Sequence, residues 1–298
     1  MLRVALKQQR ILVSIIIINY KTDSLTLKAV NSVFENIKDV SFEVIVIDNN
    51  SSETYLEEKL AFYHNVSFFK LNKNIGFGKA NNLGFKYSKG DYIFLLNSDA
   101  FLLDSKTVPG FIDYLKNHEN VAIVGANLIT DNNKKNICHG RFLSISKILC
   151  DYGIKKVSKE EYLAELATAS RCYFKVPTVV DHLTGAAIMI KREIVEKHGL
   201  FDPRYFMYLE DMDLCFRYRR EGYYSVLIPN ITIMHLGGQS RIKDPKIERK
   251  IDREIRYSKY LFLRNVTNWP TAYFLYILGK FISLNRRGRK RLKSIVNG

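Results

Sequence analysis

The sequence has few cysteines and lacks the short motifs of several large enzyme classes. Its four cysteines, Cys138, Cys150, Cys172 and Cys215, are scattered and form no Cys-x-x-Cys pair. Neither a disulfide framework nor a zinc site is therefore expected, and reduced thiols are typical of a cytoplasmic protein. A Gly-x-x-x-x-Gly-Lys-Ser/Thr loop and a Gly-x-Ser-x-Gly elbow are both absent. These absences remove support for a P-loop nucleotide hydrolase and for a serine hydrolase.

No segment near the start is typical of a signal peptide or a membrane span. The apolar run over residues 11–19 is shorter than the ~20 residues that cross a bilayer. No small-residue cleavage site follows this run, as a signal peptide would require. Its β-branched composition predicts a buried strand instead.

Positive charge is concentrated at the C-terminal end of the chain. The net charge is +16, but residues 241–298 contain 16 Lys/Arg against 4 Asp/Glu, which leaves +4 for residues 1–240. A nearly balanced body argues against nucleic acid as a partner. The basic tail indicates proximity to an anionic surface.

The first half of the chain alternates segments with strand and helix patterns. Strands are predicted at residues 13–19, 42–47, 66–71, 92–96 and 121–125, and helices at residues 23–37, 51–63, 77–88 and 105–117. Parallel neighbouring strands need a crossover that is usually a helix, so this alternation predicts an α/β fold with a mostly parallel sheet flanked by helices.

The second half is less regular at first. Residues 126–182 are interpreted as an insertion that bears on the substrate, with a helix near residues 158–169. Further strands are predicted at residues 185–190, 223–228 and 231–235, and further helices at residues 211–220, 244–264 and 270–284. The last two helices would form a C-terminal helical extension.

Polar clusters stand at the ends of three predicted strands. They are Asn19-Tyr20, Asp48-Asn49-Asn50 and Asn97-Ser98-Asp99. In parallel sheets, ligands bind at the carboxyl ends of the strands, so these clusters predict a binding site. Asp99 could hold a divalent cation or cap the next helix, although Asp104 and Ser105 are better placed to cap it.

Two further stretches contain groups suited to chemistry. Glu210-Asp211-Met212-Asp213 crowds three carboxylates, which would raise the pKa of at least one of them and suit a general base or a cation site. The alternative is a helix amino terminus, where carboxylates complement the helix macrodipole. Both can hold at once, with Asp213 as a cap and Asp211 facing a pocket. His235 ends an apolar strand and could be a packed histidine or a metal or phosphate ligand. Arg241 could bind a diphosphate.

The glycine-rich stretch at residues 74–84 has two interpretations. It could be a phosphate loop or only a tight loop that enters a helix. The first strand is followed by Asn19-Tyr20-Lys21-Thr22 without a glycine. That sequence counts against the dinucleotide-binding turn of Rossmann dehydrogenases.

Seven stretches together resemble the family 2 glycosyltransferases, which are inverting enzymes of GT-A fold that use nucleotide sugars. They occur in the family's order at residues 14–20, 46–52, 74–84, 95–100, 184–192, 201–217 and 235–240. The pattern is similar to the rhamnosyltransferase-like branch, which builds cell-surface polysaccharide on lipid-linked acceptors. The resemblance implies a Rossmann-like GT-A domain over residues 1–240 and a basic, aromatic helical extension over residues 241–298.

The resemblance implies binding roles for residues already singled out. The expected substrate-binding residues are Tyr20, Asp48, Asn50, Asn74, Gly76, Asn97, Gly185, Ala186 and Arg241. Tyr20 and Asp48 would hold the nucleotide base, with Asn50 and Asn74 around the nucleoside and sugar. Gly185 and Ala186 would line the pocket of the donor sugar.

The resemblance also implies a metal site and a catalytic base. Asp99 and His235 would hold Mg²⁺ or Mn²⁺ against the donor diphosphate. Asn97 stands where the family often has aspartate, so cation binding would rest mainly on Asp99. Asp211 would be the catalytic base, and Glu210 would orient the acceptor or the base.

The expected partners are a dTDP- or UDP-linked sugar donor and a lipid-linked or polysaccharide acceptor. The tail contains Trp269, Tyr273, Phe274, Tyr276 and Phe281 ahead of the basic residues 286–291. This pattern fits peripheral attachment to the inner face of the cell membrane, or else a helix packed on the body or in a dimer. The alternative functions are an inactive sugar-nucleotide or polysaccharide-binding subunit, a sugar nucleotidyltransferase, and a nucleic-acid binder acting through the tail.

Overall fold

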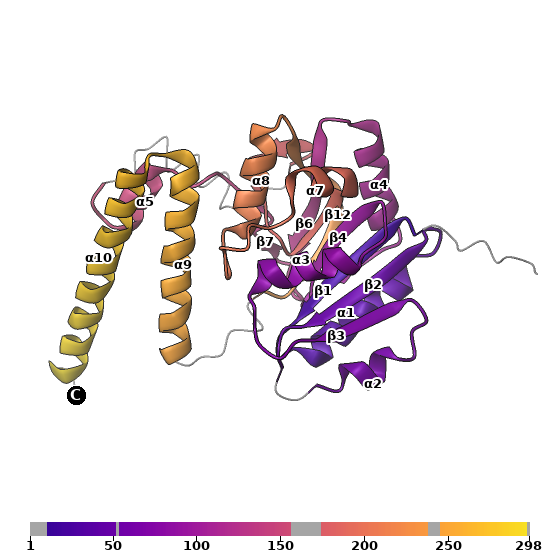
Figure 1. Ribbon diagram of the computed structural model, residues 1–298, viewed down its shortest axis with the longest axis horizontal. Helices are drawn as coiled ribbons and strands as arrows, with labels where there is room; N and C mark the ends of the chain where they lie inside the picture. The colour runs from indigo at the N-terminus through magenta and orange to yellow at the C-terminus, as the bar shows by residue number, and fades with distance from the viewer. Residues whose placement is uncertain (1–10, 52–53, 156–173, 238–244, 297–298) are drawn as a thin grey trace, which may run out of the picture.

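The computed structural model describes residues 11–51, 54–155, 174–237 and 245–296. A central sheet is flanked by helices, and a pair of long C-terminal helices lies to one side of it (Figure 1). The sheet has the strand order β3-β2-β1-β4-β11-β6-β12-β5. Its strands are β1 (Val13–Asn19), β2 (Phe42–Asp48), β3 (Val66–Lys70), β4 (Tyr92–Asn97), β5 (Ala100–Leu102), β6 (Val121–Ile129), β11 (Ala187–Lys191) and β12 (Tyr224–His235).

Short strands and the helices complete the architecture. The short strands are β7 (Lys135–Asn136), β8 (His139–Gly140), β9 (Thr178–Val180) and β10 (His182–Leu183). The helices are α1 (Asp23–Asn36), α2 (Leu56–Leu60), α3 (Phe77–Tyr87), α4 (Thr107–Asn117), α5 (Ile145–Asp151), α7 (Arg192–His198), α8 (Glu210–Arg220), α9 (Pro245–Val266) and α10 (Trp269–Val296).

The α/β class predicted from the sequence is confirmed, and the sheet is mixed. Strand β1 pairs in parallel with β2 and with β4, and β2 pairs in parallel with β3. Strand β11 is antiparallel to both of its neighbours, β4 and β6. The parallel register places Asn19 opposite Asp48 and Ile18 opposite Asn97. The predicted polar clusters therefore share one edge of the sheet.

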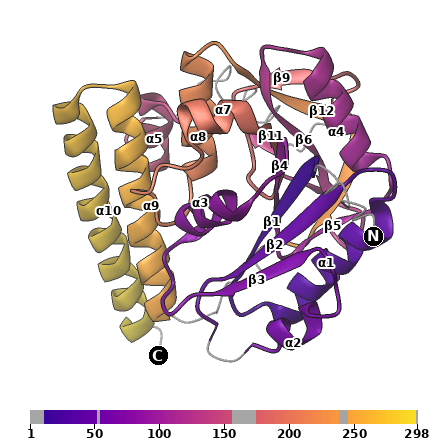
Figure 2. The ribbon, with the colours of Figure 1, turned by 45° about the vertical axis from the view of Figure 1, so that its right-hand side comes forward.

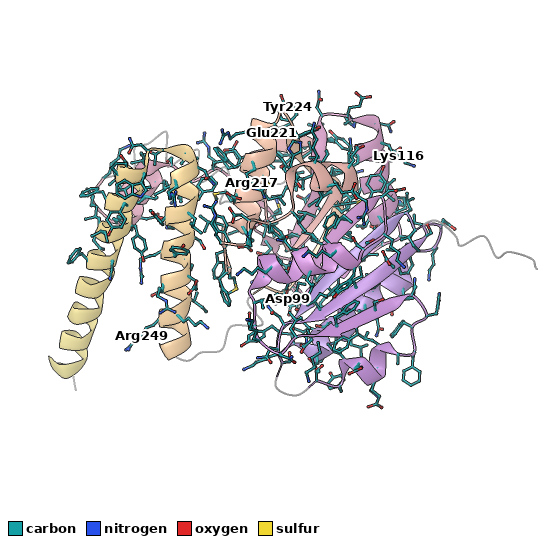
Figure 3. All side chains as sticks on the ribbon, viewed as in Figure 1. Asp99, Lys116, Arg217, Glu221, Tyr224 and Arg249 are labelled. Atoms are coloured by element: carbon teal, nitrogen blue, oxygen red, sulfur yellow. The ribbon has the colours of Figure 1, made fainter. Side chains whose placement is uncertain are left out.

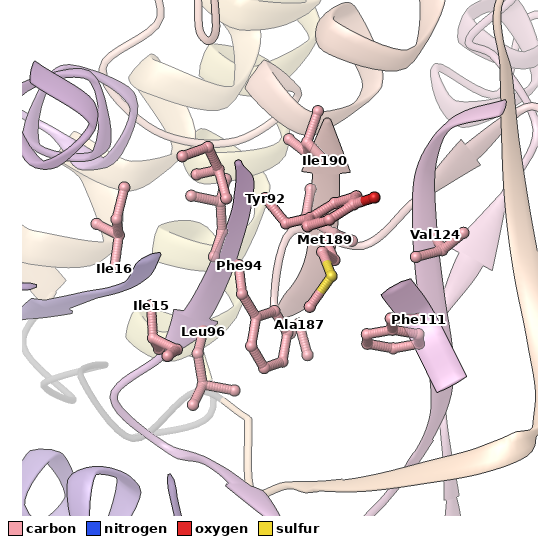
Figure 4. Close-up of a cluster of buried hydrophobic side chains, with 14 of the residues drawn as sticks. Ile15, Ile16, Tyr92, Phe94, Leu96, Phe111, Val124, Ala187, Met189 and Ile190 are labelled. Carbon is pink, nitrogen blue, oxygen red and sulfur yellow. The ribbon is translucent and has the colours of Figure 1, made fainter. Parts of the chain in front are cut away.

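The sheet is buried on both faces, as its continuous apolar strands require. Consecutive β1 residues, Ile15 and Ile16, are fully buried although their side chains point to opposite faces. Phe94 meets the ring of Phe111 edge to face with 5.8 Å between the ring centroids, and Met189 of β11 lies close to Phe94 (Figure 4). This packing fixes the strands whose ends form the site.

Several boundaries differ from the sequence prediction. Strand β6 continues to Ile129, into the predicted insertion, and α2 covers only Leu56–Leu60. Strand β12 is a single strand through Pro229, where the sequence predicts a break. Its pairing with β6 shifts register between Ile228 and Thr232, and Asn127 donates to the Pro229 carbonyl at 2.7 Å. Strand β12 can include Pro229 at this register shift, because no ladder hydrogen bond is required from the proline nitrogen there. The helix predicted near residues 158–169 lies outside the described residues.

Helices α9 and α10 pack on the body through a second apolar core. Its buried members are Leu143, Ile148, Phe262, Leu263, Ala272 and Leu275. Met212 and Phe216 of α8 pack against this cluster. Helix α9 lies between α10 and the body in both ribbon views (Figures 1 and 2). Among the described residues, no helix is long and apolar enough to cross a membrane.

Candidate active site

The end of β2 is organised around the buried carboxylate of Asp48. Its Oδ1 accepts hydrogen bonds from Asn19 Nδ2 at 2.7 Å and from Ser51 Oγ at 2.5 Å, and its Oδ2 accepts one from the Ser51 N–H at 3.0 Å. Asp48 has no exposed surface. These bonds hold the turn in which Asn50 has a φ of 68°. Asp48 therefore shapes the loop beside Tyr20, which is half-buried at the end of β1.

Asn49 connects this loop to the glycine-rich segment, a role that the sequence analysis missed. Its amide nitrogen donates to Asn74 Oδ1 at 3.1 Å and to the Gly76 carbonyl at 3.3 Å. Its amide oxygen accepts from the Ile75 N–H at 2.9 Å. The glycine-rich segment is thus a tight loop that enters α3 and is tied to the end of β2.

The predicted metal ligands Asp99 and His235 come together. Asp99 Oδ1 lies 3.4 Å from His235 Nε2, and the Leu236 N–H donates to the Asp99 carbonyl at 3.0 Å. Asp99 lies between β4 and β5, and β5 pairs with the end of β12 that carries His235. Asp104, instead of Asp99, accepts the N–H groups of Lys106 and Thr107 where α4 begins.

A chain of hydrogen bonds joins this corner to the acidic helix. The Asn97 N–H donates to the Ala186 carbonyl at 2.8 Å. The neighbouring Gly185 N–H donates to Asp211 Oδ2 at 3.0 Å. Asn97, Ala186, Gly185 and Asp211 therefore form one continuous wall between the metal corner and α8.

The acidic cluster divides into groups with different environments. Burial, and then the neighbouring Asp211, raise the pKa of Glu210 to about 8. Crowding was expected to raise one pKa in this cluster, and burial is the larger cause. Asp213 does not cap α8: its carboxylate is buried, forms an ion pair with Arg217 at 2.8 Å and accepts from Asn265 of α9 at 2.7 Å.

His182 is a second neighbour of Asp211 that the sequence analysis did not identify. Burial lowers the pKa of His182, and the Asp211 carboxylate acts in the opposite direction. The ring lies against Gly140, where a Cβ would overlap with it. No sequence signal pointed to His182, because its place depends on the pairing of β10 with β8.

Unpaired buried polar atoms surround the same wall. They are Asn97 Oδ1, His182 Nδ1, Glu210 Oε2 and His235 Nδ1. Buried polar atoms in native proteins nearly always have hydrogen-bond partners, so a group of such atoms close together makes this region a candidate for binding a polar ligand. This arrangement identifies the wall as the candidate active site.

Backbone strain is found in the loops of this site. The residues with positive φ other than glycine are Lys21, Asn50, Asn133, Tyr208 and Leu209 within the described chain. All but Asn133 lie in loops next to the predicted site residues. Such conformations cost about 1–3 kcal/mol each and persist only where the surroundings enforce them, as active sites do.

A hollow lined by Lys116, Glu119 and Lys191 lies elsewhere on the molecule. Figure 3 shows Lys116 far from Asp99, toward the opposite end of the sheet. Lys191 there donates to the carbonyls of His118 and Glu119 at 3.0 and 3.2 Å. The ammonium of Lys191 at this hollow thus has partners within the protein.

Comparison with known proteins shows the family to which the chain belongs. Residues 14–199 match the model of the family described as Glycosyl transferase family 2. This segment is more than half of the 298 residues. The chain belongs to this family. The matched segment includes the ends of β1, β2 and β4 and the Gly185–Ala186 wall. The predicted family is therefore confirmed.

Relatives with assigned names are also glycosyltransferases. The chain is 27% identical over 256 residues to "dTDP-rhamnosyl transferase RfbF" of Shigella flexneri, covering 84% of this chain and 77% of the relative. It is 30% identical over 129 residues to the N-acetylglucosaminyl-diphospho-decaprenol L-rhamnosyltransferase of Mycobacterium tuberculosis, covering 40% and 41% of the two chains. The family 2 transferase is thus rhamnosyltransferase-like, as expected.

The solved structures show the fold. The mannosyltransferase PcManGT from Pyrobaculum calidifontis, solved with GDP-Man and Mn²⁺, superposes with a TM-score of 0.58 at 14% identity, over 92% of this chain and 70% of that one. Such similarity establishes the GT-A fold. The chain is an inverting glycosyltransferase of glycan synthesis.

Proposed function

We propose that this family 2 enzyme is a cation-dependent transferase that moves rhamnose or a hexose from a nucleoside-diphosphate donor to an acceptor hydroxyl. The observation that supports it is the wall from Asp99 and His235 through Asn97, Ala186 and Gly185 to Asp211. This run of contacts supports an expected cation corner and an expected base as parts of one site. Family membership favours transfer over the nucleotidyltransferase and binding-only alternatives.

The residues at the metal corner fit Mg²⁺ or Mn²⁺. Neighbouring ligand atoms of an octahedral ion with bonds of 2.0–2.1 Å lie about 3 Å apart, close to the 3.4 Å between Asp99 Oδ1 and His235 Nε2. No group of three or more His, Cys, Asp or Glu side chains that could hold a metal occurs in the described residues. Two protein ligands suit an ion that shares its remaining positions with substrate phosphates and water.

Asp211 is suited to act as the general base. Its Oδ2 is held by the Gly185 N–H, and its Oδ1 accepts from the Met212 N–H at 2.8 Å. The acceptor oxygen forms a bond to the anomeric carbon as the bond from that carbon to the diphosphate oxygen breaks, and the acceptor proton passes to Asp211. A bound cation would neutralise the charge that develops on the departing diphosphate.

Glu210 assists as a proton-bearing neighbour. Because its pKa is about 8, its carboxyl is mostly protonated at neutral pH and can donate a hydrogen bond. We assign Glu210 to orienting the acceptor hydroxyl or the base.

The nucleotide would bind along the loops at the ends of β1 and β2. Tyr20 and Asn50 border this region, and Asn74 and Gly76 are tied to it through Asn49. The name of the Shigella relative supports a dTDP-sugar, and UDP-sugars remain within the proposal. In this proposal Asp48 contributes to nucleotide binding through the loop that it holds. Arg241, which is proposed to bind the diphosphate, lies outside the described residues.

The acceptor is proposed to be a lipid-linked or polysaccharide glycan, met at the inner face of the cell membrane. The name of the mycobacterial relative includes a diphospho-decaprenol acceptor. Exposed aromatic side chains on α10 support the membrane contact: Trp269 is 58% exposed, Phe274 63% and Phe281 62%. Aromatic rings favour the membrane interface, and basic residues attract anionic lipids. The division into a domain over residues 1–240 and an extension over 241–298 is part of this proposal.

A thermal-shift panel tests the donor and the cation. Selective ligands stabilise the native state by mass action, so dTDP, UDP and GDP are compared with and without Mn²⁺. We expect stabilisation by dTDP or UDP that depends on the cation. Transfer of a radiolabelled sugar from its nucleoside-diphosphate donor to a lipid extract then tests the reaction. Release of this sugar to water alone would contradict the acceptor assignment.

Liposome flotation tests the membrane contact on the full chain. The variant Trp269→Ala/Phe274→Ala/Phe281→Ala should float less well with anionic vesicles than the original protein does. Phe62→Ala is the matched control, because Phe62 is 82% exposed and lies beyond α2. Equal flotation of the triple variant and the control would remove the membrane from the proposal.

A further inference from the structure

Helix α9 contacts the strained loop that carries the acidic helix. This loop, residues 205–209, includes Tyr208 with φ of 72° and Leu209 with φ of 64°. Leu209 directly precedes Glu210 and Asp211, so its conformation sets the direction in which α8 begins. A left-handed conformation at two successive residues without glycine needs external support.

Part of that support comes from the nucleotide side of the site. The Phe77 N–H donates to the Phe206 carbonyl at 2.9 Å, at the start of α3. Gly76 packs so closely that a Cβ on it would overlap with the same carbonyl oxygen. These contacts fix the beginning of the loop.

Helix α9 supplies further contacts from one of its faces. The hydroxyl of Ser258, which is 1% exposed, donates to the Met207 carbonyl at 3.1 Å. The amide of Asn265 donates to Asp213 Oδ1 at 2.7 Å, and the ammonium of Lys250 lies 5.5 Å from the centroid of the Phe206 ring. Lys250, Ser258 and Asn265 follow one another at about two helical turns, so they share one face of α9.

The contact of Asn265 reaches the centre of a buried network. Asp213 also accepts from Tyr205 Oη at 3.2 Å and from Arg217 Nε at 2.8 Å. Tyr205 is the first residue of the strained loop and Arg217 lies on α8, so Asp213 joins both ends of the segment that includes Glu210 and Asp211. Asn265 anchors this network to α9.

We propose that Ser258 and Asn265 are positioning residues for Asp211. Helix α9 therefore contributes to catalysis through these two side chains. This inference rests on the proposed function, because it assigns Asp211 as the base. Without the two side chains, the loop can relax from its left-handed conformation and α8 can begin in another direction. Asp211 then leaves the Gly185 N–H that holds it.

The test is the double variant Ser258→Ala/Asn265→Ala in the full chain. We expect kcat to fall ~10–100-fold, as a small misplacement of a catalytic group does, with the KM for the donor unchanged. The conservative variant Ser258→Thr keeps the hydroxyl and should retain kcat. Val266→Ala is the matched control, because Val266 follows Asn265 on α9 and is 37% exposed.

Hydrogen–deuterium exchange separates this inference from the proposed function. In the double variant, exchange should increase in residues 205–214 and stay unchanged in β1, whether or not a transfer assay is available. Unchanged exchange in residues 205–214, or unchanged kcat, would overturn the positioning role. Faster exchange in that segment of a protein that transfers no sugar would uphold the contact and reject the proposed function instead.

Discussion

The main-chain N–H of Gly185 donates a hydrogen bond to Asp211 Oδ2 at 3.0 Å. Gly185 precedes β11, a central antiparallel strand, and Asp211 is in the first turn of α8. The main chain just before β11 thus holds one oxygen of the Asp211 carboxylate, and the Met212 N–H holds the other at 2.8 Å. These two hydrogen bonds fix the orientation of the Asp211 carboxylate, on which its proposed role as a base depends.

Replacing Asp211 by asparagine should abolish transfer and preserve donor binding. The amide is nearly the same size but cannot accept the acceptor proton, and general-base assistance is typically worth ~10²–10⁴ in rate. The kcat of Asp211→Asn is measured beside the affinity for the nucleoside diphosphate with Mn²⁺. Near-normal turnover by this variant would remove Asp211 from the role of base.

Glu210 should make the folded protein less stable as the pH rises. Its pKa of about 8 in the folded protein lies above the ordinary glutamate value of 4.5, so the folded state binds the proton more tightly. The stabilisation is fully present below pH 4.5 and is lost as the pH rises through 8. Glu210→Gln should therefore unfold at a higher temperature than the original protein at pH 9, with a much smaller difference at pH 5.

The same substitution tests the hydrogen-bonding role in catalysis. Glu210→Gln retains an N–H donor at all pH values and should keep more activity than Glu210→Ala, above pH 8 in particular. Glu196→Gln is the control, because Glu196 is 60% exposed and lies on α7. Loss of all activity in the glutamine variant, with donor binding intact, would indicate that Glu210 acts through its negative charge.

The metal corner should depend on both of its side chains. Asp99→Ala and His235→Ala should each raise the Mn²⁺ concentration required for half-maximal stabilisation by the nucleotide, with the larger effect at Asp99 because it supplies the negative charge. A chelator should remove the nucleotide stabilisation of the original protein. Asp113→Ala, at the exposed face of α4, should leave the Mn²⁺ requirement unchanged. An unchanged requirement in both site variants would reject the proposed metal ligands.

Much of the fold and part of the site were predictable from local sequence. The β-branched run of β1 is typical only of a strand buried on both faces of a parallel sheet. The polar residues after β1, β2 and β4 then lie close together, because the carboxyl ends of parallel strands meet at one edge of the sheet. Asp99 and His235 were identified separately, one after a buried strand and one at the end of another. Their convergence depends on the pairing of β5 with β12, which the structure supplies.

The missed features depend on contacts between distant segments. Asn49 binds the loop at Asn74 and Gly76, and nothing in its own neighbourhood in the sequence distinguishes it from Asn50. Ser258 and Asn265 belong to a helix whose pattern is only that of an amphipathic surface. Their importance arises from the loop at Met207 and from Asp213, which lie about 50 residues earlier in the chain.

Substitution of Gly76 by alanine should separate backbone strain from loss of the contact between α3 and the Phe206 loop. Gly76 has φ of 89°, and a Cβ there would overlap with the Phe206 carbonyl oxygen. Gly222 has φ of 88° in the turn after α8, and a Cβ there would meet nothing within 4 Å. Both alanine variants should lose about 1–3 kcal/mol of stability from the positive φ. Only Gly76→Ala should also lower kcat, because it displaces the loop that leads to Asp211; equal kcat values in the two variants would show that transfer does not depend on this contact.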